Sequence, residues 1–176
     1  MIIGISGKMG TGKTTLARHL VKTLGGEVMS FADALRQEVK EHFGIPMGTM
    51  TDQEAKATLV IQVGFKDMLL RELLQWWGAE RRRSDPDYWI KQLLHKAGEG
   101  IVLVDDVRYR NEARAIQAAG GHVVRIDPYP GWQSSVGADH LSETDLDDYD
   151  YFDMRLKPKY GDLYKTAFTI KKELTT

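Results

Sequence analysis

The chain has 176 residues, no cysteine, and 24 basic against 25 acidic side chains, which gives a net charge of −1. This length fits one compact domain that buries a core without disulfides, and the lack of cysteine excludes a thiolate metal site and a cysteine nucleophile. The balanced charge argues against nucleic acid or a membrane surface as partners. No leader peptide or apolar run of about 18 residues is evident, so we expect a soluble protein of the cytoplasm.

The first predicted elements are a strand and a helix joined by glycines. Residues 2–6 form a β-branched run typical of a buried strand. Residues 14–26 place leucines at helical spacing and end in two glycines, a helix stop signal. A second strand over 27–32 and a second helix over 32–44 follow, so the chain begins with alternating strands and helices.

The stretch over residues 51–98 is predicted to be almost wholly helical. Thr51 and Glu54 have the spacing of a capping box that would start the first helix. Gly64 is expected to interrupt the helical region, and Pro86 to begin its last helix.

The remaining predicted elements again alternate. The strand IVLVDD, the helix NEARAIQAAGG, the strand HVVRID, the strand YFDMRL and a closing helix follow in the order 101–106, 111–121, 122–127, 151–156 and 161–174. Such alternation predicts an α/β fold of three layers with a central, mostly parallel sheet.

A long connection over about 127–150 is predicted to be a lid-like flap, because loops of this length are usually functional or mobile. The acidic run over 139–153 indicates a solvated face rather than a metal site. Between Ile126 and Met154 there is no lysine or arginine, which leaves His140 as the flap's only candidate cation.

The motif GKMGTGKT at residues 7–14 predicts a phosphate-binding loop, because it follows a strand and opens a helix. Glycines let backbone N–H groups approach phosphate, Lys13 adds a mobile cation, and the Thr14 hydroxyl can bind Mg²⁺. A merely connecting turn would not explain the lysine and threonine, and a dinucleotide site would need a third glycine. The predicted ATP-binding residues are Gly7, Lys8, Met9, Gly10, Thr11, Gly12, Lys13, Thr14 and Thr15.

A second magnesium ligand is expected at the end of the strand IVLVDD, where ligands bind in such folds. Asp106 is the first choice, acting through water, and Asp105 is the second. The alternative is that one of these aspartates caps the following helix.

The helical stretch is larger than a crossover requires, and its side chains suit a mononucleotide. Arginines can bind phosphate, aromatic rings a base face, and glutamine a base edge. One of the two tryptophans is expected in the core, and the arginine run has the alternative of a solvated helix end. The residues concerned are Arg71, Gln75, Trp76, Trp77, Arg81, Arg82 and Arg83.

Taken together, these motifs resemble the phage-type deoxynucleoside monophosphate kinases of the P-loop class. The matching pieces run in chain order as GKMGTGKTT (7–15), SFADALR (30–36), LLQWWGAERRR (73–83), DPDYW (85–89), VDDVRYRNEA (104–113), GGHVVRI (120–126) and HLSE (140–143). The resemblance implies transfer of the γ-phosphoryl group of ATP to a deoxynucleoside monophosphate. It also implies that Asp33 and Arg36 line the acceptor site, Gln75 reads the base and Arg108 holds the acceptor phosphate. The family usually has Asn-Asp-Gly where this chain has KYGDL, which puts a contact at Lys159 in doubt.

The predicted organisation is a single P-loop domain with a core over about 1–44 and 99–176 and an acceptor-binding insert over about 45–98. Its substrates are small nucleotides, with ATP and Mg²⁺ required, and a homodimer is left open.

In the predicted reaction, Arg108 clamps the acceptor phosphate with help from Arg36 or Arg71, while Lys13 and one of the run 81–83, taken as Arg83, neutralise the migrating group. Two alternatives stay open. A kinase with a hydroxyl acceptor, such as a dephospho-coenzyme A or nucleoside kinase, would use Asp33 as a base, and a nucleotide-gated module would hydrolyse ATP only to change shape.

Overall fold

The computed structural model describes residues 1–133 and 141–174, and the chain divides into two compact units. The sheet unit consists of Met1–Ser30 and His95–Thr176, and the helical unit of Phe31–Leu94. The helix that begins at residue 31, which we assigned to the core, therefore groups with the helical unit. In the described ranges, no helix is both long and apolar enough to cross a membrane.

The sheet unit is built on a parallel sheet, as predicted. In the described part of the chain the sheet has five strands. In spatial order they are β2 (Glu27–Met29), β5 (Val102–Val107), β1 (Ile2–Gly7), β6 (His122–Ile126) and β7 (Met154–Leu156). Every neighbouring pair is parallel. The α/β prediction is confirmed.

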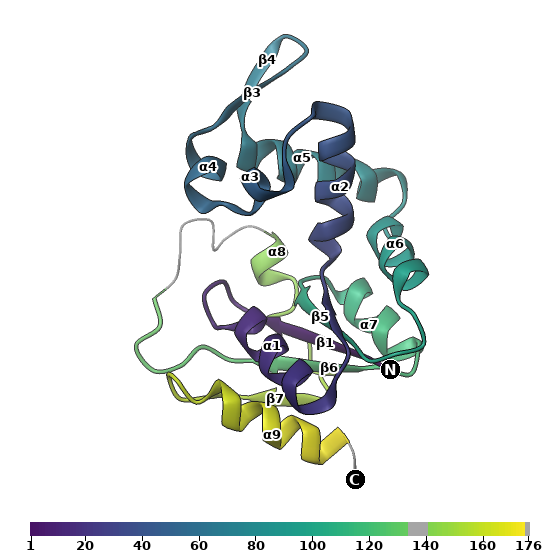
Figure 1. Cartoon of the computed structure of the whole chain (residues 1–176), viewed down its shortest axis with the longest axis vertical. Helices are drawn as coiled ribbons and strands as arrows, with labels where there is room; N and C mark the ends of the chain where they lie inside the picture. The colour runs from purple at the N-terminus through teal and green to yellow at the C-terminus, as the bar shows by residue number, and fades with distance from the viewer. Residues whose placement is uncertain (134–140, 175–176) are drawn as a thin grey trace. The chain divides into compact units, whose positions relative to one another are not determined.

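Helices cover both faces of this sheet (Figure 1). Ile3 and Ile5 of β1 are fully buried in a cluster with side chains of α1 (Lys13–Leu24) and α9 (Leu163–Leu174). Gly4, between them, faces the opposite side, where a Cβ would meet Ile116 of α7 (Arg110–Ala118) at 2.8 Å. Because successive residues of a strand point to opposite faces, the sheet is the middle of three layers.

The parallel arrangement brings three chain segments to one edge of the sheet. The phosphate loop follows β1, Asp106 lies near the end of β5, and the flap follows β6. In parallel α/β sheets the carboxyl ends of the strands form the ligand-binding edge. The fold therefore positions these three segments for one site.

The helical unit contains a β-hairpin that the sequence analysis missed. Its elements are α2 (Phe31–Phe43), α3 (Met47–Thr51), α4 (Gln53–Thr58), β3 (Val60–Val63), β4 (Lys66–Leu69), α5 (Leu70–Ser84) and the start of α6 (Tyr88–Lys96). The prediction that residues 51–98 are almost wholly helical is thus wrong for 60–69. Burial alternates along β3, with Ile61 and Val63 partly covered and Val60 exposed, which is the period of a strand.

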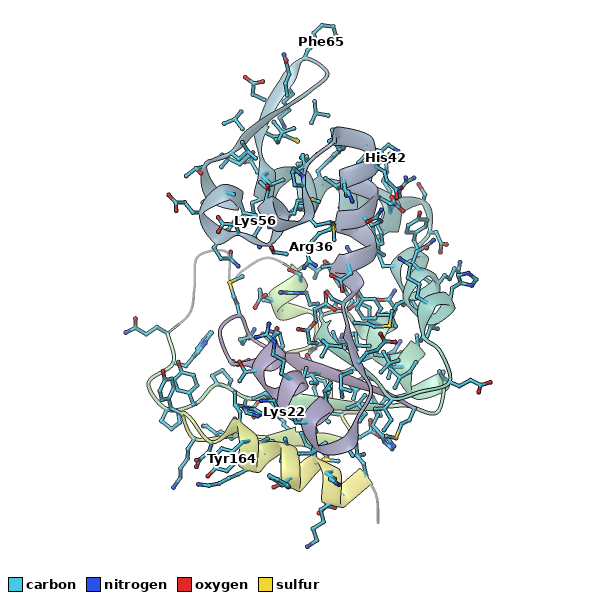
Figure 2. The ribbon with its side chains drawn as sticks, viewed as in Figure 1. Lys22, Arg36, His42, Lys56, Phe65 and Tyr164 are labelled. Atoms are coloured by element: carbon cyan, nitrogen blue, oxygen red, sulfur yellow. The ribbon has the colours of Figure 1, made fainter. Side chains whose placement is uncertain are left out.

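Gly64 makes the turn of this hairpin instead of interrupting a helix. Its φ of +62° lies in the left-handed region that tight hairpin turns require. Phe65 follows at the tip with a fully exposed ring (Figure 2).

The predicted capping box at Thr51 is also wrong. Thr51 is the last residue of α3, and its hydroxyl donates to the Gly48 carbonyl at 2.8 Å. Asp52 caps α4 instead, because its carboxylate accepts from the Ala55 N–H at 2.7 Å. The cap lies one residue later than predicted because a short helix ends at Thr51 and the next one starts after Asp52. The spacing of Thr51 and Glu54 does not reveal this break.

Candidate active site

The loop between β1 and α1 has the backbone of a phosphate cradle. Gly10 and Gly12 have φ values of 79° and 90°, and Gly12 immediately precedes α1. A Cβ on Gly12 would lie 2.5 Å from Leu163 Cδ1, and one on Gly7 would lie 2.8 Å from the Ile126 carbonyl oxygen. Glycine is required at these positions, and the loop leads directly into the positive end of the helix dipole.

Side chains within the loop brace it from inside. Thr11 is buried, and its hydroxyl donates to the Lys8 carbonyl at 2.8 Å. The Lys13 ammonium donates to the carbonyls of Gly7 and Lys8 at 2.8 and 2.9 Å. Within residues 1–133 and 141–174, the bonds described for Lys13 go to carbonyl oxygens and not to a carboxylate, so an incoming anion can compete for its charge.

Burial lowers the pKa of Lys13 to about 8, with a further contribution from the neighbouring cation Arg108. Glu143 and Asp106 oppose this shift, and Arg125 adds to it. A lysine with a pKa near 8 is charged at neutral pH, but its charge is poorly solvated. A phosphate at the loop would supply the missing counter-charge.

Acidic residues of the flap contact this cationic loop. Glu143 lies in α8 (Leu141–Thr144) and is buried, with 8% of its surface exposed. Its carboxylate accepts from the Met9 N–H at 2.9 Å and from the Arg108 guanidinium. The Lys8 ammonium donates to the Glu143 carbonyl at 2.6 Å and to Asp147 at 2.5 Å.

Asp147 also pairs with Arg125, a charged residue that lies in the buried strand β6. Arg125 is 5% exposed and donates to the Ser6 hydroxyl at 2.9 Å and to Asp147 at 3.0 Å. Its Nε has no hydrogen-bond partner in the described ranges. Burial lowers the pKa of Arg125, while the charge of Asp147 raises it.

The prediction of a solvated acidic face is therefore wrong for Glu143, which is buried, whereas Asp147, Asp148 and Asp150 are exposed as predicted. Glu143 and Asp147 are ion-paired at the phosphate loop, and Arg110 pairs with Asp145 and Asp148. Asp139 and His140 lie outside the described residues. The carboxylates of this segment act as partners for basic side chains of the sheet unit.

The predicted metal ligands lie on two neighbouring segments of the sheet unit. Thr14 is exposed in the first turn of α1, and Asp106 in β5 accepts from the Ser30 hydroxyl at 2.7 Å. Within residues 1–133 and 141–174, no group of three or more acidic or histidine side chains could hold a metal ion. Mg²⁺ commonly keeps several waters and binds substrate phosphates, so a hydroxyl and one carboxylate fit it.

A cavity of about 300 Å³ adjoins the phosphate loop on the side of α9. Its rings are Tyr129 and Tyr160, whose centroids are 5.1 Å apart at a steep angle. The cavity is lined by Gly10, Thr11, Gly12, Thr15, Tyr129, Pro158, Lys159, Tyr160, Gly161 and Leu163. A cavity with aromatic and apolar walls beside a phosphate site suits a flat base.

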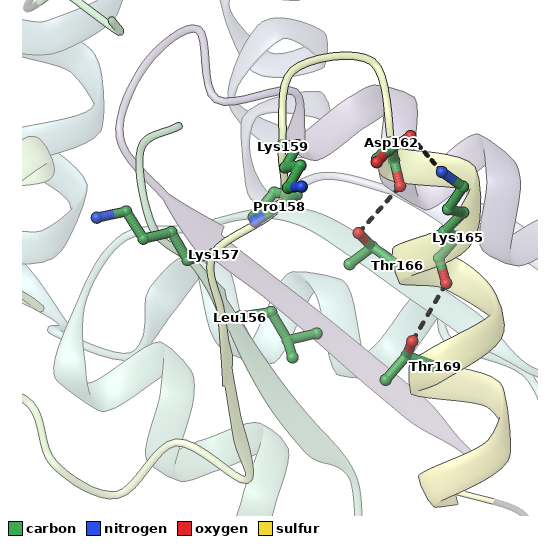
Figure 3. A pocket seen from close by; sticks show the side chains of 8 residues that line it. All are labelled: Leu156, Lys157, Pro158, Lys159, Asp162, Lys165, Thr166 and Thr169. Carbon is green, nitrogen blue, oxygen red and sulfur yellow. Dashed lines mark hydrogen bonds and ion pairs between the residues drawn. The ribbon is translucent and has the colours of Figure 1, made fainter. Parts of the chain in front are cut away.

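A second cavity, of about 260 Å³, lies between β7 and the first turns of α9 (Figure 3). Asp162 accepts from Lys165 at 2.9 Å there, and Thr166 donates to the Asp162 carbonyl. It shares Pro158 and Lys159 with the first cavity, so Lys159 borders both.

The residues that we predicted to bind the acceptor lie in the helical unit, except Arg108. Asp33 and Arg36 are one turn apart on α2 and pair with each other at 2.5 Å. On α5, Arg71 is half-buried and Gln75 is exposed. Trp76 is 41% exposed, which leaves its ring available to a ligand.

Trp77 and Arg81 belong to a structural cluster of the helical unit. The Glu38 carboxylate accepts from Trp77 Nε1 and Arg81 Nε, each at 2.9 Å, and from the Tyr88 hydroxyl. Although burial raises the pKa of Glu38, these hydrogen bonds hold it below its usual value. Trp77 is thus the core member of the tryptophan pair, as expected for one of the two.

Arg83 is placed differently from Arg81. It lies in the last turn of α5, its side chain is 78% exposed, and it pairs with Glu80 at 2.6 Å. Of these two arginines, only Arg83 is largely open to solvent.

Four residues that surround the loop were not predicted from the sequence: Glu143, Arg125, Tyr129 and Tyr160. Signals for two of them were present, since Glu143 ends the motif HLSE and Arg125 is a charge inside an apolar strand. The tyrosines follow two different strands and meet only in the folded chain.

Comparisons with known proteins agree with this geometry. A protein of Acanthamoeba polyphaga mimivirus, described as "Putative deoxynucleotide monophosphate kinase", is 30% identical over 176 residues, covering 89% of this chain and 87% of that protein. Dephospho-CoA kinase from Campylobacter jejuni is similar in structure, with a TM-score of 0.52, 14% identity, and coverage of 98% of this chain and 96% of that one. Shikimate kinase from Acinetobacter baumannii gives a TM-score of 0.51 at 15% identity, with coverage of 99% and 92%. No protein-family model matches the chain.

The parallel sheet, the phosphate loop and these structural neighbours define a P-loop kinase fold. At their low identity, the neighbours speak for the fold alone. The mimivirus relative is closer in sequence, and the chain belongs to its family, that of the deoxynucleotide monophosphate kinases.

Proposed function

We propose that this protein transfers the γ-phosphoryl group of ATP to a deoxynucleoside monophosphate, giving the diphosphate and ADP, as a phage-type member of its family. The observation that carries the proposal is the phosphate loop, with Lys13 partly buried, charged at neutral pH and bonded to carbonyls. The description of the mimivirus relative supports the choice of acceptor.

The triphosphate of ATP binds along residues 7–15 in this proposal. The N–H groups at the start of α1 and the Lys13 ammonium attract its charge. Thr14 and Asp106 would hold Mg²⁺, and the ion would supply positive charge that offsets the negative charge of the phosphates. Ser30 orients Asp106 through its hydroxyl hydrogen bond.

The base of the donor nucleotide occupies the cavity that Tyr129 and Tyr160 help to line. The cavity begins at Gly10 and Gly12, so a nucleotide with its phosphates in the loop would have its base within reach. Tyr160 is 81% exposed and is available to stack on a base.

Six residues are proposed to bind the acceptor: Asp33, Arg36, Arg71, Gln75, Trp76 and Arg108. An arginine fork suits its phosphate, and the exposed Trp76 ring and Gln75 amide suit a base face and edge. An acceptor phosphate is ionised at neutral pH, so Asp33 orients and is not needed as a base.

Catalysis in this scheme depends on alignment and on cancellation of charge. Lys13 neutralises the migrating phosphoryl group from the donor side. Arg83 is the proposed second cation, because its exposed guanidinium can leave its pairing with Glu80 at little cost.

The decisive experiment measures ADP release from ATP and Mg²⁺ against a panel of ribo- and deoxynucleoside monophosphates. Lys13→Ala serves as the blank, and Lys22→Ala, which changes a lysine in the last turn of α1, is the matched control. We expect turnover with at least one deoxynucleoside monophosphate and none above the blank without an acceptor. A flat panel would refute the proposal.

The same assay distinguishes the proposed monophosphate kinase from a kinase with a hydroxyl acceptor. Nucleosides and dephospho-coenzyme A are tested beside the monophosphates. Activity confined to those hydroxyl acceptors would replace the proposed reaction, and slow ATP hydrolysis that no acceptor changes would indicate a nucleotide-gated module.

A further inference from the structure

The strongest feature that the proposed reaction leaves unexplained is the carboxylate of Glu143 at the phosphate loop. This side chain is buried, and it accepts from a backbone N–H of the loop and from a guanidinium. A backbone N–H and an arginine are the donors that proteins commonly offer to phosphate. The Glu143 carboxylate therefore makes the hydrogen bonds that a bound phosphate would make, although it is part of the protein itself.

We propose that the Glu143 carboxylate holds the place of a substrate phosphate at Met9 and Arg108, and that nucleotide binding exchanges it for that phosphate. The inference rests on the proposed function, because it takes the displacing anion to be a nucleotide phosphate. It makes the flap a competitor for the site, so the measured affinity for nucleotide is lower than the intrinsic one.

The charges around the loop give the reason for such a carboxylate. Lys8, Lys13, Arg108 and Arg125 all belong to this cluster, and they repel one another. Glu143 and Asp147 lie among them and offset part of this repulsion. A folded loop with these cations needs an anion, and Glu143 supplies one until phosphate arrives.

The construction of the segment explains how Glu143 can leave. Helix α8 is only four residues long, which is too short for a helix to be stable by itself. The contacts described for Glu143 are polar, and Leu141 beside it is 59% exposed. Leu146 and Tyr149, each 2% exposed, anchor the chain further on, so the turn that carries Glu143 can detach while the segment stays attached.

This also accounts for the unusual composition of the flap, which has acidic residues and no lysine or arginine from 127 to 153. A flap that brought cations to the migrating phosphoryl group would need basic residues. One that occupies the cation cluster in exchange for phosphate needs carboxylates, as found at Glu143 and Asp147.

The test uses inorganic tripolyphosphate as the probe and calorimetry as the readout. Glu143→Gln keeps the size of the side chain and an oxygen for the Met9 N–H but removes the charge that holds Arg108. We expect this variant to bind tripolyphosphate about tenfold more tightly than the wild type. Asp148→Asn is the control with the same charge change, because Asp148 is exposed and pairs with Arg110, and we expect its affinity within about twofold of wild type.

Unchanged or weaker binding by Glu143→Gln would overturn the inference and make Glu143 a fixed support of Arg108. A second measurement needs no variant. Tripolyphosphate should speed hydrogen exchange in the wild-type peptide over 141–145, and unchanged or slower exchange there would also overturn it.

The panel assay keeps this test separate from the proposed function. A wild-type protein that phosphorylates monophosphates, with no gain in the variant, would refute only the exchange. A variant that binds more tightly, in a protein that phosphorylates none of the panel, would refute only the reaction.

Discussion

Two buried or half-buried glutamates gather donors in different units, and they differ in what surrounds them. Glu38 receives a guanidinium, an indole N–H and a hydroxyl from the helical unit, so one carboxylate faces one full positive charge. Glu143 lies in a cluster that includes Lys8, Lys13, Arg108 and Arg125. The first arrangement is satisfied within the chain and fastens helices together, whereas the second is rich in cations and suited to an anionic ligand.

Among the substitutions that test this comparison, Lys13→Ala should have the largest effect, and the effect should be on turnover. Lys13→Ala removes the cation that follows the phosphates, and turnover with the best acceptor should fall by about 10³-fold, as losses of comparable cations do. The coupled assay for ADP release measures it, with Lys22→Ala as the control at a distance from the loop. Undiminished turnover in Lys13→Ala would contradict the proposal that the cations around Glu143 bind an anionic ligand.

Loss of the Glu38 carboxylate should lower the stability of the protein and should have little effect on ligand binding. Glu38→Ala leaves Trp77, Arg81 and Tyr88 without their shared acceptor and should lower the free energy of unfolding by about 2 kcal/mol. Urea unfolding measures this, and Glu41→Ala on the exposed side of α2 should stay within about 0.5 kcal/mol of wild type. A loss no greater than that of the control would show that the cluster does not fasten the unit.

The pKa of Lys13 predicts a pH dependence of binding. Phosphate favours charged Lys13, so affinity for tripolyphosphate should begin to fall as the pH approaches 8. Well above pH 8 it should fall about tenfold per pH unit, until the pKa of the bound state is reached. Calorimetry in a pH series tests this, with Lys13→Ala expected to lack the step. A wild-type profile without the step would place the pKa elsewhere.

The lowered pKa of Lys13 makes stability rise with pH, whereas it makes the affinity for phosphate fall with pH. The folded-state pKa of about 8 lies below the ordinary value of 10.5, so between these two pH values the unfolded chain binds the proton more strongly. The stability of the wild type relative to Lys13→Met should therefore rise with pH through this window.

The smallest expected effect concerns the aromatic cavity. Tyr160→Ala removes one wall and should raise the KM for ATP about fivefold with kcat unchanged, the size of one stacking contact. Steady-state kinetics measure it. Substitution of Tyr164, an exposed tyrosine in the first turn of α9, by alanine should change KM by less than about twofold. Equal effects of the two substitutions on KM would contradict the proposal that this cavity binds the base of ATP.

The sequence alone predicted the parts of this protein that depend on local pattern. The strand at residues 2–6, the phosphate loop with Lys13 and Thr14, and the alternation that gives a parallel sheet all follow from spacing over a few residues. Such features depend on backbone geometry and periodicity, which neighbouring residues determine. The hairpin over 60–69 was missed because two four-residue strands are too short to be separated from a helix by periodicity.

Tertiary structure decided which charges meet. Glu143 is 134 residues from Met9 in sequence, yet its carboxylate binds the N–H of that residue, and Trp77 rather than Trp76 is the tryptophan that contacts Glu38. The partner of a carboxylate depends on how distant segments pack and on which groups lose water there, and no local pattern contains that information. The sequence by itself therefore determined that a phosphate loop is present, and the fold decided what lies against it.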